Sequence, residues 1–572
     1  MTGENREKWD SEATILALFL LFTAAVRIAL IRTATINPDE LFLTGGGWRV
    51  SQGVLPFLGY MDVHPPLLAV LSALPFALFR LGASFIDLFR VTSFLLTSAF
   101  MVFLYLATAR NCSRKTALLA LAILNSFVFV LERTTHARES VPAFFALFAA
   151  IWLITTSNSY AKIDLRFVLA AALTGIACQF HLVLAIAVAA LCVWILLESR
   201  PSRRISGAIV LSVVFGAIAV AAFFLPYLLI YRGEIGSALT AQLHTFQFNR
   251  LYQQNEVMDF AYLLSRLFLQ NPIHWAAVFL TLAVFNVRLI RRRIAEPFLR
   301  LCVLMADAGL AAVILAQQPF EHRTFLLVFF TSVLAAVLIS DLFAFSPRAG
   351  SKTGRLIITS AVVLIGVAGI VLYLVQVRSD DRKFAAQSTG SIPPGQSLLH
   401  KATGDEAIAW LDNRTGSYDS FTYRPYDQRR CVINFFFHES DPGETVLSDW
   451  QNPPLRALPA AYHHGNILYH VYTTHEIETQ PAAISLLSRY DSAYSVEDHT
   501  PEDRMVRLLN KTEPRIIYVE GNIASLFRQS TKLRNWVANH YQLVIHSGCG
   551  AAFAILPRTT SGKTISGSDN NQ

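Results

Sequence analysis

An acidic pair, Asp39 and Glu40, follows the first apolar segment of the chain by only a few residues. Carboxylates at the edge of a membrane can meet both lipid and water, and a half-dry environment raises the pKa of a carboxyl group toward the range of a general base. Asp39 is therefore our candidate base, and Glu40 is a second catalytic candidate. A structural alternative is that Asp39 caps a helix over 40–50.

The segment that follows, from Gly53 to Leu67, turns the chain back toward the membrane. Within it, Asp62 and His64 stand two residues apart, just before two prolines. A carboxylate oxygen and an imidazole nitrogen can both bind a divalent metal ion, so this pair is a candidate metal site. An Asp before a Pro-Pro turn can also simply cap or bend the chain, and this alternative stays open.

A second polar stretch, Glu132 to Ser140, separates two later apolar runs. Glu139 within it is a third catalytic candidate, either as a metal ligand or as a group that orients an acceptor. The alternative is an ion pair with Arg138 or Arg133. His181, at an expected span end, could either pack there or contact an anionic group.

The turn 317–323 gathers Glu, His and Arg between two apolar runs. Arg323 suits bidentate phosphate recognition, with His322 beside it, although an arginine at a helix end can also be an interfacial anchor. Arg27 and Arg32, near the end of the first apolar segment, are expected to be anchors of this kind.

The elements that position these residues are membrane helices, because 53% of the 572 residues are hydrophobic and only 15% are charged. The first apolar run is too long for a removable signal peptide and is expected to remain as a span. Eleven spans are predicted, roughly at 13–32, 87–109, 116–131, 140–157, 166–181, 182–198, 205–231, 273–290, 298–316, 324–343 and 355–377.

With these spans, the basic turns all fall on the side of the N-terminus, which the positive-inside rule makes cytoplasmic. The net charge of +8 therefore comes from the basic turns that membrane topology requires. It does not indicate a nucleic-acid-binding surface, so nucleic acid is excluded as a partner. If the apolar stretch 65–81 crossed the membrane, every later turn would lie on the opposite side of it. We therefore expect a re-entrant or interfacial helix there, inside a first outer loop over 33–86, in a transmembrane domain over 1–377.

The chain becomes polar after Val377, and residues 378–558 are predicted to form a soluble α/β domain outside the membrane, followed by a disordered tail over 559–572. Strands are expected at 397–399, 467–472, 515–520, 542–546 and 552–557, and helices at 405–413 and 523–540. Cys431 and Cys549 fall in this domain, and their spacing leaves open whether they form a disulfide.

Three segments together resemble the GT-C polytopic glycosyltransferases, in particular the branch of the lipid A aminoarabinose transferase and the protein O-mannosyltransferases. The acidic pair and the run Gly53, Pro56, Tyr60 and Asp62 to His64-Pro65-Pro66-Leu67 look like the first loop of that family. Many relatives carry Lys in the place of His64. Arg138-Glu139 is similar to the second acidic loop, and His181, ending GIACQFH, stands where relatives have a phosphate-contacting Lys.

The resemblance implies an integral cell (inner) membrane enzyme that moves a sugar from a polyprenyl-phosphate carrier to a lipid, glycan or protein acceptor on the non-cytoplasmic face, with inversion. Lipopolysaccharide or protein glycosylation are reactions of this class. It implies that Tyr60, His64, Arg138, His181, His322 and Arg323 bind substrate, with a divalent metal ion as the possible cofactor. A phosphate-linked sugar has a good leaving group, so the site needs a base for the acceptor and cations for the phosphate.

A transporter or flippase of a lipid-linked sugar is the competing class, because it would also need polar groups in and beside the membrane. Transporters place charges at mid-membrane between internal repeats. We see no internal repeat in this sequence, and its polar candidates fall on one face. The enzyme is therefore the preferred hypothesis, while the sugar, the acceptor and the metal requirement stay open.

Overall fold

The computed structural model forms two compact units. The first comprises Met1–Ala34, Gly46–Leu58 and Asp62–Asp380, and the second comprises Thr35–Gly45, Gly59–Met61 and Asp381–Gln572. The structure describes residues 11–34, 38–60, 62, 64–78, 85–156, 162–199, 205–254, 272–315, 324–346, 348, 350–389, 399–415, 426–441, 444–447, 458–459, 500–519, 521–546 and 549–557.

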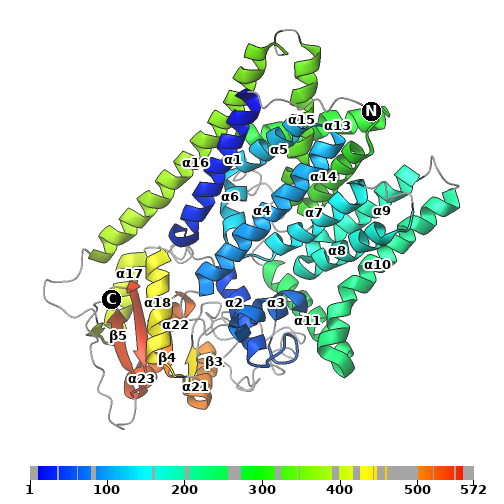
Figure 1. The fold of residues 1–572 in the computed structure, drawn as a ribbon. Helices are drawn as coiled ribbons and strands as arrows, with labels where there is room; N and C mark the ends of the chain where they lie inside the picture. Colours follow the sequence, from blue (N-terminus) through cyan, green and yellow to red (C-terminus); the bar gives the residue numbers. More distant parts are fainter. Residues whose placement is uncertain are drawn as a thin grey trace. The chain divides into compact units, whose positions relative to one another are not determined.

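The first unit is a bundle of apolar helices (Figure 1). Eight helical segments of the described residues are long and apolar enough to cross a membrane. They are α1 (Ser11–Thr33), α4 (Phe85–Asn111), the 3-10 turn η2 (Leu182–Leu184) with α9 (Ala185–Ser199), α10 (Ile205–Tyr231) with its continuation to Thr245, α13 (Pro272–Ile290), α14 (Pro297–Leu315), α15 (Phe325–Phe345) and the first part of α16 (Lys352–Thr389).

A ninth candidate is the pair α5 (Arg114–Ser126) and α6 (Val128–Thr135), which is bent by 81°. Three shorter apolar helices are α3 (Pro66–Leu78), α7 (Ser140–Thr156) and α8 (Leu165–Phe180). A helix lies at each of the eleven predicted positions, but α7 and α8 have only 17 and 16 residues. At 1.5 Å per residue they reach ~25 Å, less than the ~30 Å of a bilayer core, so eight or nine of the predicted spans meet the length criterion.

The predicted span over 116–131 is a bent pair of helices, because the helix breaks at Phe127, which has extended backbone angles. Two side chains before the break bond back to their own helix: Asn125 donates to the Leu121 carbonyl (2.8 Å) and Ser126 to the Ile123 carbonyl (2.6 Å). Such local bonds compete with a regular helix. The ring of His274 lies 4.7 Å from the Phe127 ring and its Nε2 lies 2.9 Å from the Ser126 hydroxyl.

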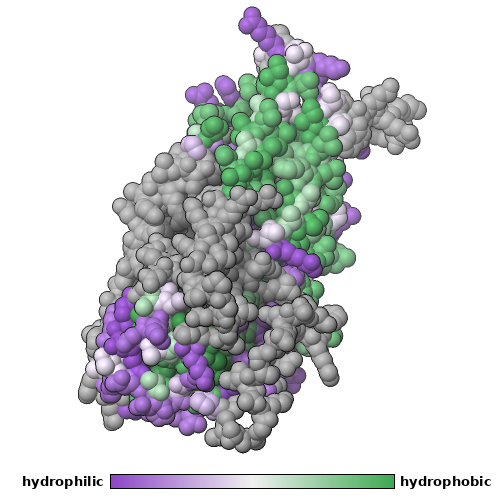
Figure 2. Space-filling view, turned by 90° about the vertical axis from the view of Figure 1, so that its left-hand side faces the viewer, coloured by the Kyte–Doolittle hydropathy of each residue, from purple (hydrophilic) through white to green (hydrophobic). Residues whose placement is uncertain are grey.

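Aromatic rings fill the centre of the bundle, where α4, α7 and α15 meet. The ring of Phe100 lies 5.8 Å from Phe148 and 5.5 Å from Phe329, and all three side chains are buried. The outer surface is equally apolar: Ile357, Leu364 and Leu372 on α16 are each more than 60% exposed. Figure 2 shows this hydrophobic surface over the bundle. Apolar side chains both inside and outside indicate a bundle that faces lipid.

Ion pairs join the helices at one end of the bundle, which we call the basic end, where α1, α14 and α16 begin and α9, α13 and α15 end. Arg300 forms a bidentate pair with Glu198, with bonds of 2.6 and 2.5 Å. Arg288 donates to Asp341 at 2.8 Å, and Arg355 lies 3.1 Å from Glu12. Glu12, near the start of α1, and Arg355, near the start of α16, therefore lie at the same end, as the predicted topology requires.

The opposite end, the loop end, is where α1 and α10 end and where α4 and α7 begin. Figure 1 places α3 and α11 (Ile235–Gln254) at this end. α3 packs against α8 and α10. The face of α3 that does not pack is apolar, with Leu71, Leu74 and Leu78 exposed by 42%, 51% and 72%. A short helix thus lies where the re-entrant or interfacial helix was predicted.

The second unit contains a six-stranded mixed sheet in the order β1-β5-β6-β4-β2-β3. Its strands are β1 (Leu399–Lys401), β2 (Thr445–Leu447), β3 (Leu458–Pro459), β4 (Ile516–Val519), β5 (Gln542–His546) and β6 (Ala551–Ile555). β1, β5, β6 and β4 pair antiparallel, while β4, β2 and β3 pair parallel. Every residue of β4 and β6 is buried, so both faces of these strands are covered.

Within the described residues, five helices accompany the sheet: α17 (Gly404–Thr415), α18 (Tyr426–Glu439), α21 (Pro501–Thr512), α22 (Gly521–Gln529) and α23 (Thr531–His540). The predicted strands at 515–520, 542–546 and 552–557 and the helix at 405–413 match β4, β5, β6 and α17. The predicted helix 523–540 is two helices, because Ser530 caps α23 by accepting from the Leu533 amide. The predicted strand 467–472 lies outside the described residues.

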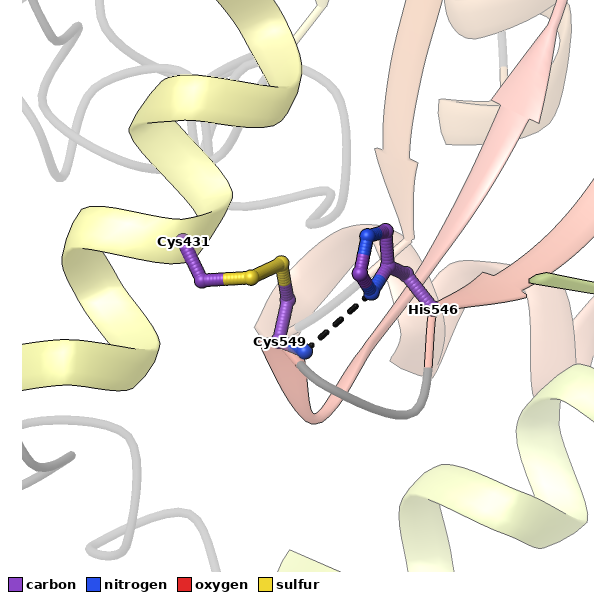
Figure 3. The surroundings of a disulfide bond; sticks show 3 residues. All are labelled: Cys431, His546 and Cys549. Carbon is purple, nitrogen blue, oxygen red and sulfur yellow. Dashed lines mark hydrogen bonds between the residues drawn. A yellow bond between two sulfur atoms is a disulfide. The ribbon is translucent and has the colours of Figure 1, made fainter. Parts of the chain in front are cut away.

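A disulfide joins Cys431 on α18 to Cys549 before β6, with a Cα–Cα distance of 5.1 Å (Figure 3). The bridge closes a long loop, since 118 residues separate the two cysteines in sequence. Beside the bridge, the Phe435 ring on α18 stacks on Phe553 of β6 at 4.1 Å. The disulfide thus fastens α18 to the start of β6, an interior strand of the sheet that this helix already packs against.

Candidate active site at the loop end of the bundle

Arg90, in the second turn of α4, lies at the centre of the loop end and is fully buried. Its Nη1 donates to the Ile31 and Ala34 carbonyls, each at 2.9 Å, where α1 ends. Its Nη2 lies 3.4 Å from Nδ1 of His136, the residue that ends α6. The last carbonyls of a helix lack partners within it and carry partial negative charge, so a guanidinium stabilises them.

Thr134 on α6 provides further links between the same three helices. Its carbonyl accepts from the Thr97 hydroxyl on α4 at 3.1 Å. Its own hydroxyl accepts from Nε of Arg27 on α1 at 3.3 Å. Arg27 is only 2% exposed, so the expectation of an interfacial anchor was wrong for it. Arg32 is 78% exposed in its side chain and lies 3.9 Å from Asp87, which fits a surface position.

The predicted second acidic loop is buried between α6 and α7. His136, Arg138 and Glu139 are 2%, 4% and 7% exposed. The carbonyls of Arg138 and Glu139 accept from the Val141 and Ala143 amides and so start α7. Glu139 therefore stands at the N-terminus of α7, where a carboxylate is favoured by the helix dipole. The loop end thus holds the buried carboxylate of Glu139 and the buried guanidinium of Arg138 on one short connection, with Arg90 and Arg27 buried in the neighbouring helices.

The first loop forms a tight turn at Asp62 and His64. The Asp62 carboxylate accepts the His64 amide at 2.8 Å, and Nδ1 of the His64 ring lies 3.2 Å from the same oxygen, Oδ1. Asp62 is buried and His64 is half-buried. This is the turn-forming role that the sequence left open, in which an Asp side chain bonds the backbone two residues on.

The end of α10 holds the first loop through tyrosines. Tyr231 donates to the Pro56 carbonyl at 3.0 Å, and its ring lies 6.3 Å from Phe57. Tyr227, one turn earlier, donates to Gln242 Oε1 on α11 at 2.5 Å and lies within electrostatic range of Asp62. The tyrosines of α10 therefore join the first loop and α11 at the loop end.

The remaining predicted residues fall as follows. Asp39 lies in the first turn of α2 (Pro38–Ser51), whereas a capping residue would precede the helix. The helix bounds therefore do not support the alternative in which Asp39 is a cap. Glu40 on the same helix and Tyr60 after it are fully buried. His181 is half-buried between α8 and η2, where its amide donates to the Ala177 carbonyl. His322 and Arg323 lie outside the described residues.

Two places could hold a metal ion. Asp62 and His64 supply two ligand groups, but Oδ1 of Asp62 is already engaged by His64, and no group of three His, Cys, Asp or Glu ligands includes them among the described residues. Cys431, His546 and Cys549 do form such a group, with ligand atoms within 4.8 Å of one another. Their sulfurs are bonded together, however, and His546 Nδ1 accepts from the Cys549 amide at 3.3 Å (Figure 3). Neither place supports a step through a metal.

Burial also lowers the pKa of His546, which favours its neutral form. The ring packs edge-on against Phe435 at 5.5 Å. These contacts describe a packed histidine beside a structural disulfide. The Cys-His-Cys group would fit a soft metal ion only after reduction of the bridge.

Sequence reasoning missed four residues of the loop end: Arg90, His136, Tyr227 and Gln242. Arg90 lies within a predicted span, three residues after its start at 87, and an arginine inside an apolar segment is itself a signal of function. His136 lies in the polar stretch Glu132 to Ser140, where its charged neighbours are the more obvious candidates. Nothing local in the sequence distinguishes Tyr227 or Gln242, whose bond joins residues of two helices.

Comparison with family models found no match, and comparison with curated protein sequences found none. Among solved structures, the chain is similar to the Archaeoglobus fulgidus oligosaccharyltransferase tethered with an acceptor peptide, with 11% identity, coverage of 90% of this chain and 70% of that one, and a TM-score of 0.47. The archaeal oligosaccharyltransferase AglB from Archaeoglobus fulgidus, in complex with an inhibitory peptide and a dolichol-phosphate, gives 12% identity, coverage of 94% of this chain and 73% of that one, and a TM-score of 0.46.

The chain is also similar to the Saccharomyces cerevisiae protein O-mannosyltransferase Pmt1-Pmt2 complex bound to the sugar donor. That likeness has 20% identity, covers 40% of this chain and 34% of that chain, and has a TM-score of 0.31. Likenesses of this strength, with identities of 20% or less, carry no argument about the activity of this chain. Since all three scores lie below 0.5, the function proposed next depends on the residues of this chain.

Proposed function

We propose that this membrane protein is a glycosyltransferase that moves a sugar from a polyprenyl-phosphate carrier to a lipid, glycan or protein acceptor. One observation carries the proposal. Arg90, His136, Arg138 and Glu139 are all buried at one end of an apolar helix bundle, on the connections next to the predicted acidic loops. Buried cations at a membrane edge match the need of a lipid-linked phosphate that leaves with negative charge.

The roles follow from the chemistry of each side chain. Asp39, five residues after Ala34 in the sequence, is the proposed base that accepts the acceptor proton, and Glu40 and Glu139 orient the acceptor. Cationic and aromatic side chains bind the donor, namely Tyr60, His64, Arg138, His181, His322 and Arg323. A single displacement at the anomeric carbon would invert its configuration.

The proposed topology has all eleven predicted spans crossing, with the N-terminus cytoplasmic and the loop end outside. Glu12 and Arg355 at one end support it, since the basic turns cluster in sequence with that end. The exposed leucines of α3 support an interfacial helix, because they form an apolar face that lipid can cover. The soluble unit then belongs to an oxidising compartment, which its disulfide favours.

A carrier transporter is the second candidate, and the break at Phe127 favours it. Transporters build their sites from helices interrupted inside the membrane, and Ser126 and His274 lie together at such an interruption. The buried residues Arg90, His136, Arg138 and Glu139, however, lie at one end of the bundle rather than halfway along its helices.

Transfer of labelled sugar by purified protein distinguishes these two functions. We would supply a panel of polyprenyl-phosphate sugars and acceptors to the wild type, to Asp39→Asn and to the control Asp164→Asn, whose carboxylate caps α8 at the basic end. The enzyme predicts transfer by wild type and control and none by Asp39→Asn. No transfer by the wild type across the panel, or full activity of Asp39→Asn, would overturn the proposal. A chelator arm tests the metal.

A further inference from the structure

Arg90 connects the ends of two helices that come from distant parts of the sequence. Its Nη1 bonds two carbonyls at the end of α1, and its Nη2 faces His136 at the end of α6. The guanidinium is fully buried, so water does not compete for these bonds. An arginine is always protonated and can only donate, so Nδ1 of His136 is the acceptor, and a neutral His136 carries its proton on Nε2.

The two connections that Arg90 fixes are those that lead to the acidic residues. The chain leaving α1 reaches Asp39 five residues after Ala34, and the chain leaving α6 reaches Glu139 three residues after His136. An extended chain spans at most about 3.6 Å per residue, so Glu139 stays within ~11 Å of His136. The end of α6 is thus joined to a proposed catalytic carboxylate by only three residues of chain.

We propose that Arg90 is a positioning residue that holds the starts of both acidic loops in one register for the transfer reaction. This inference depends on the proposed glycosyltransferase function for its kinetic part only. The planar guanidinium suits the task because its nitrogens point in different fixed directions, whereas lysine offers a single nitrogen. Thr97 and Arg27 contact Thr134 in the last turn of α6, and Arg90 contacts His136, the residue that ends this helix.

The test compares Arg90→Gln and Arg90→Lys with Arg32→Gln, which removes an equal charge from the exposed surface of α1 near the same end. Amide hydrogen exchange of the full-length protein in detergent is followed over 31–40 and 132–139. Arg90→Gln should raise exchange in both segments by about tenfold or more while α14, α15 and the sheet stay protected. Arg32→Gln should leave both segments unchanged.

Kinetics then separate positioning from a merely structural role. A misplaced carboxylate should lower kcat by roughly 100-fold with the KM for the donor nearly unchanged, and Arg90→Lys should recover part of the loss. If Arg90 only stabilised the fold, Arg90→Gln would instead lower the yield of folded protein and leave kcat per folded molecule intact. Unchanged exchange in both segments, or an unchanged kcat in an active enzyme, would overturn the inference.

A second variant covers the case in which Arg90→Gln does not fold. His136→Phe keeps a ring but removes the acceptor of Nη2, so exchange should rise over 132–139 and not over 31–40. Equal exchange in the wild type and His136→Phe would contradict the link to α6. Because exchange needs no substrate, a wild type that transfers no sugar would refute the proposed function while the exchange arm still decides the role of Arg90.

Discussion

The two ends of the helix bundle use arginine in different ways. At the basic end, Arg300 and Arg288 meet the carboxylates of Glu198 and Asp341, so each charge is cancelled by its partner. At the loop end, Arg90 gives its bonds to main-chain carbonyls and faces an imidazole. Carboxylate pairs join two side chains, whereas bonds to main-chain carbonyls hold a guanidinium against the end of a helix. The first arrangement ties helices together through their side chains, and the second ties one side chain of α4 to the ends of α1 and α6.

Among the variants that compare the two ends, the largest effect is expected at Arg138, a buried cation of the second loop. Arg138→Gln should lower sugar transfer by about 100-fold or more, because removing one preorganised donor to a developing charge costs ~3 kcal/mol. Steady-state transfer by detergent-purified protein measures it. The control Arg348→Gln changes an exposed arginine at the basic end and should transfer at the wild-type rate. Equal losses in both variants would remove the distinction between the two ends.

Glu198→Gln should have the largest effect on stability at the basic end. It leaves the Arg300 guanidinium without its carboxylate in a site where Glu198 is 6% exposed in its side chain, which costs about 3 kcal/mol. Unfolding in detergent should shift accordingly while transfer per folded molecule is retained. The double variant Glu198→Leu with Arg300→Met should be less destabilised. If Glu198→Gln instead abolished transfer with normal stability, the basic end would carry function.

Asp341→Asn separates the effect of burial from that of charge within the basic end. Its pair with Arg288 has a similar length, 2.8 Å, but both side chains are about one-third exposed, at 34% and 36%. Solvent screens such pairs, so the expected loss of unfolding free energy is below about 1 kcal/mol. The same unfolding experiment measures it beside Glu198→Gln. A loss as large as that of the buried pair would contradict this reasoning.

Asp87→Asn should have the smallest effect of all. Asp87 lies 3.9 Å from the exposed Arg32 at the loop end, a long surface contact worth little. Both transfer and unfolding should stay close to wild type, with transfer within about twofold. A marked loss of transfer would show that the loop end responds to charge in general and not to the buried cluster around Arg90.

Local patterns were enough for much of the secondary structure. The short apolar run within 542–546 predicts β5 with its observed bounds, and long apolar runs predict α1, α13 and α15 closely. These signals are local because the period of a helix or strand is set by neighbouring residues. Hydropathy does not predict the break at Phe127, because the side-chain bonds of Asn125 and Ser126 do not change the apolar pattern of the segment.

The sequence by itself determined that the chain is a helical membrane protein with acidic loops and a polar domain, since composition and charge order are properties of the chain. Only the tertiary structure decided which distant residues meet. It brought His136 to Arg90, 46 residues earlier, and Cys431 to Cys549, 118 residues later. Such pairings depend on how helices and strands pack, and packing is a property of the whole fold rather than of any one segment.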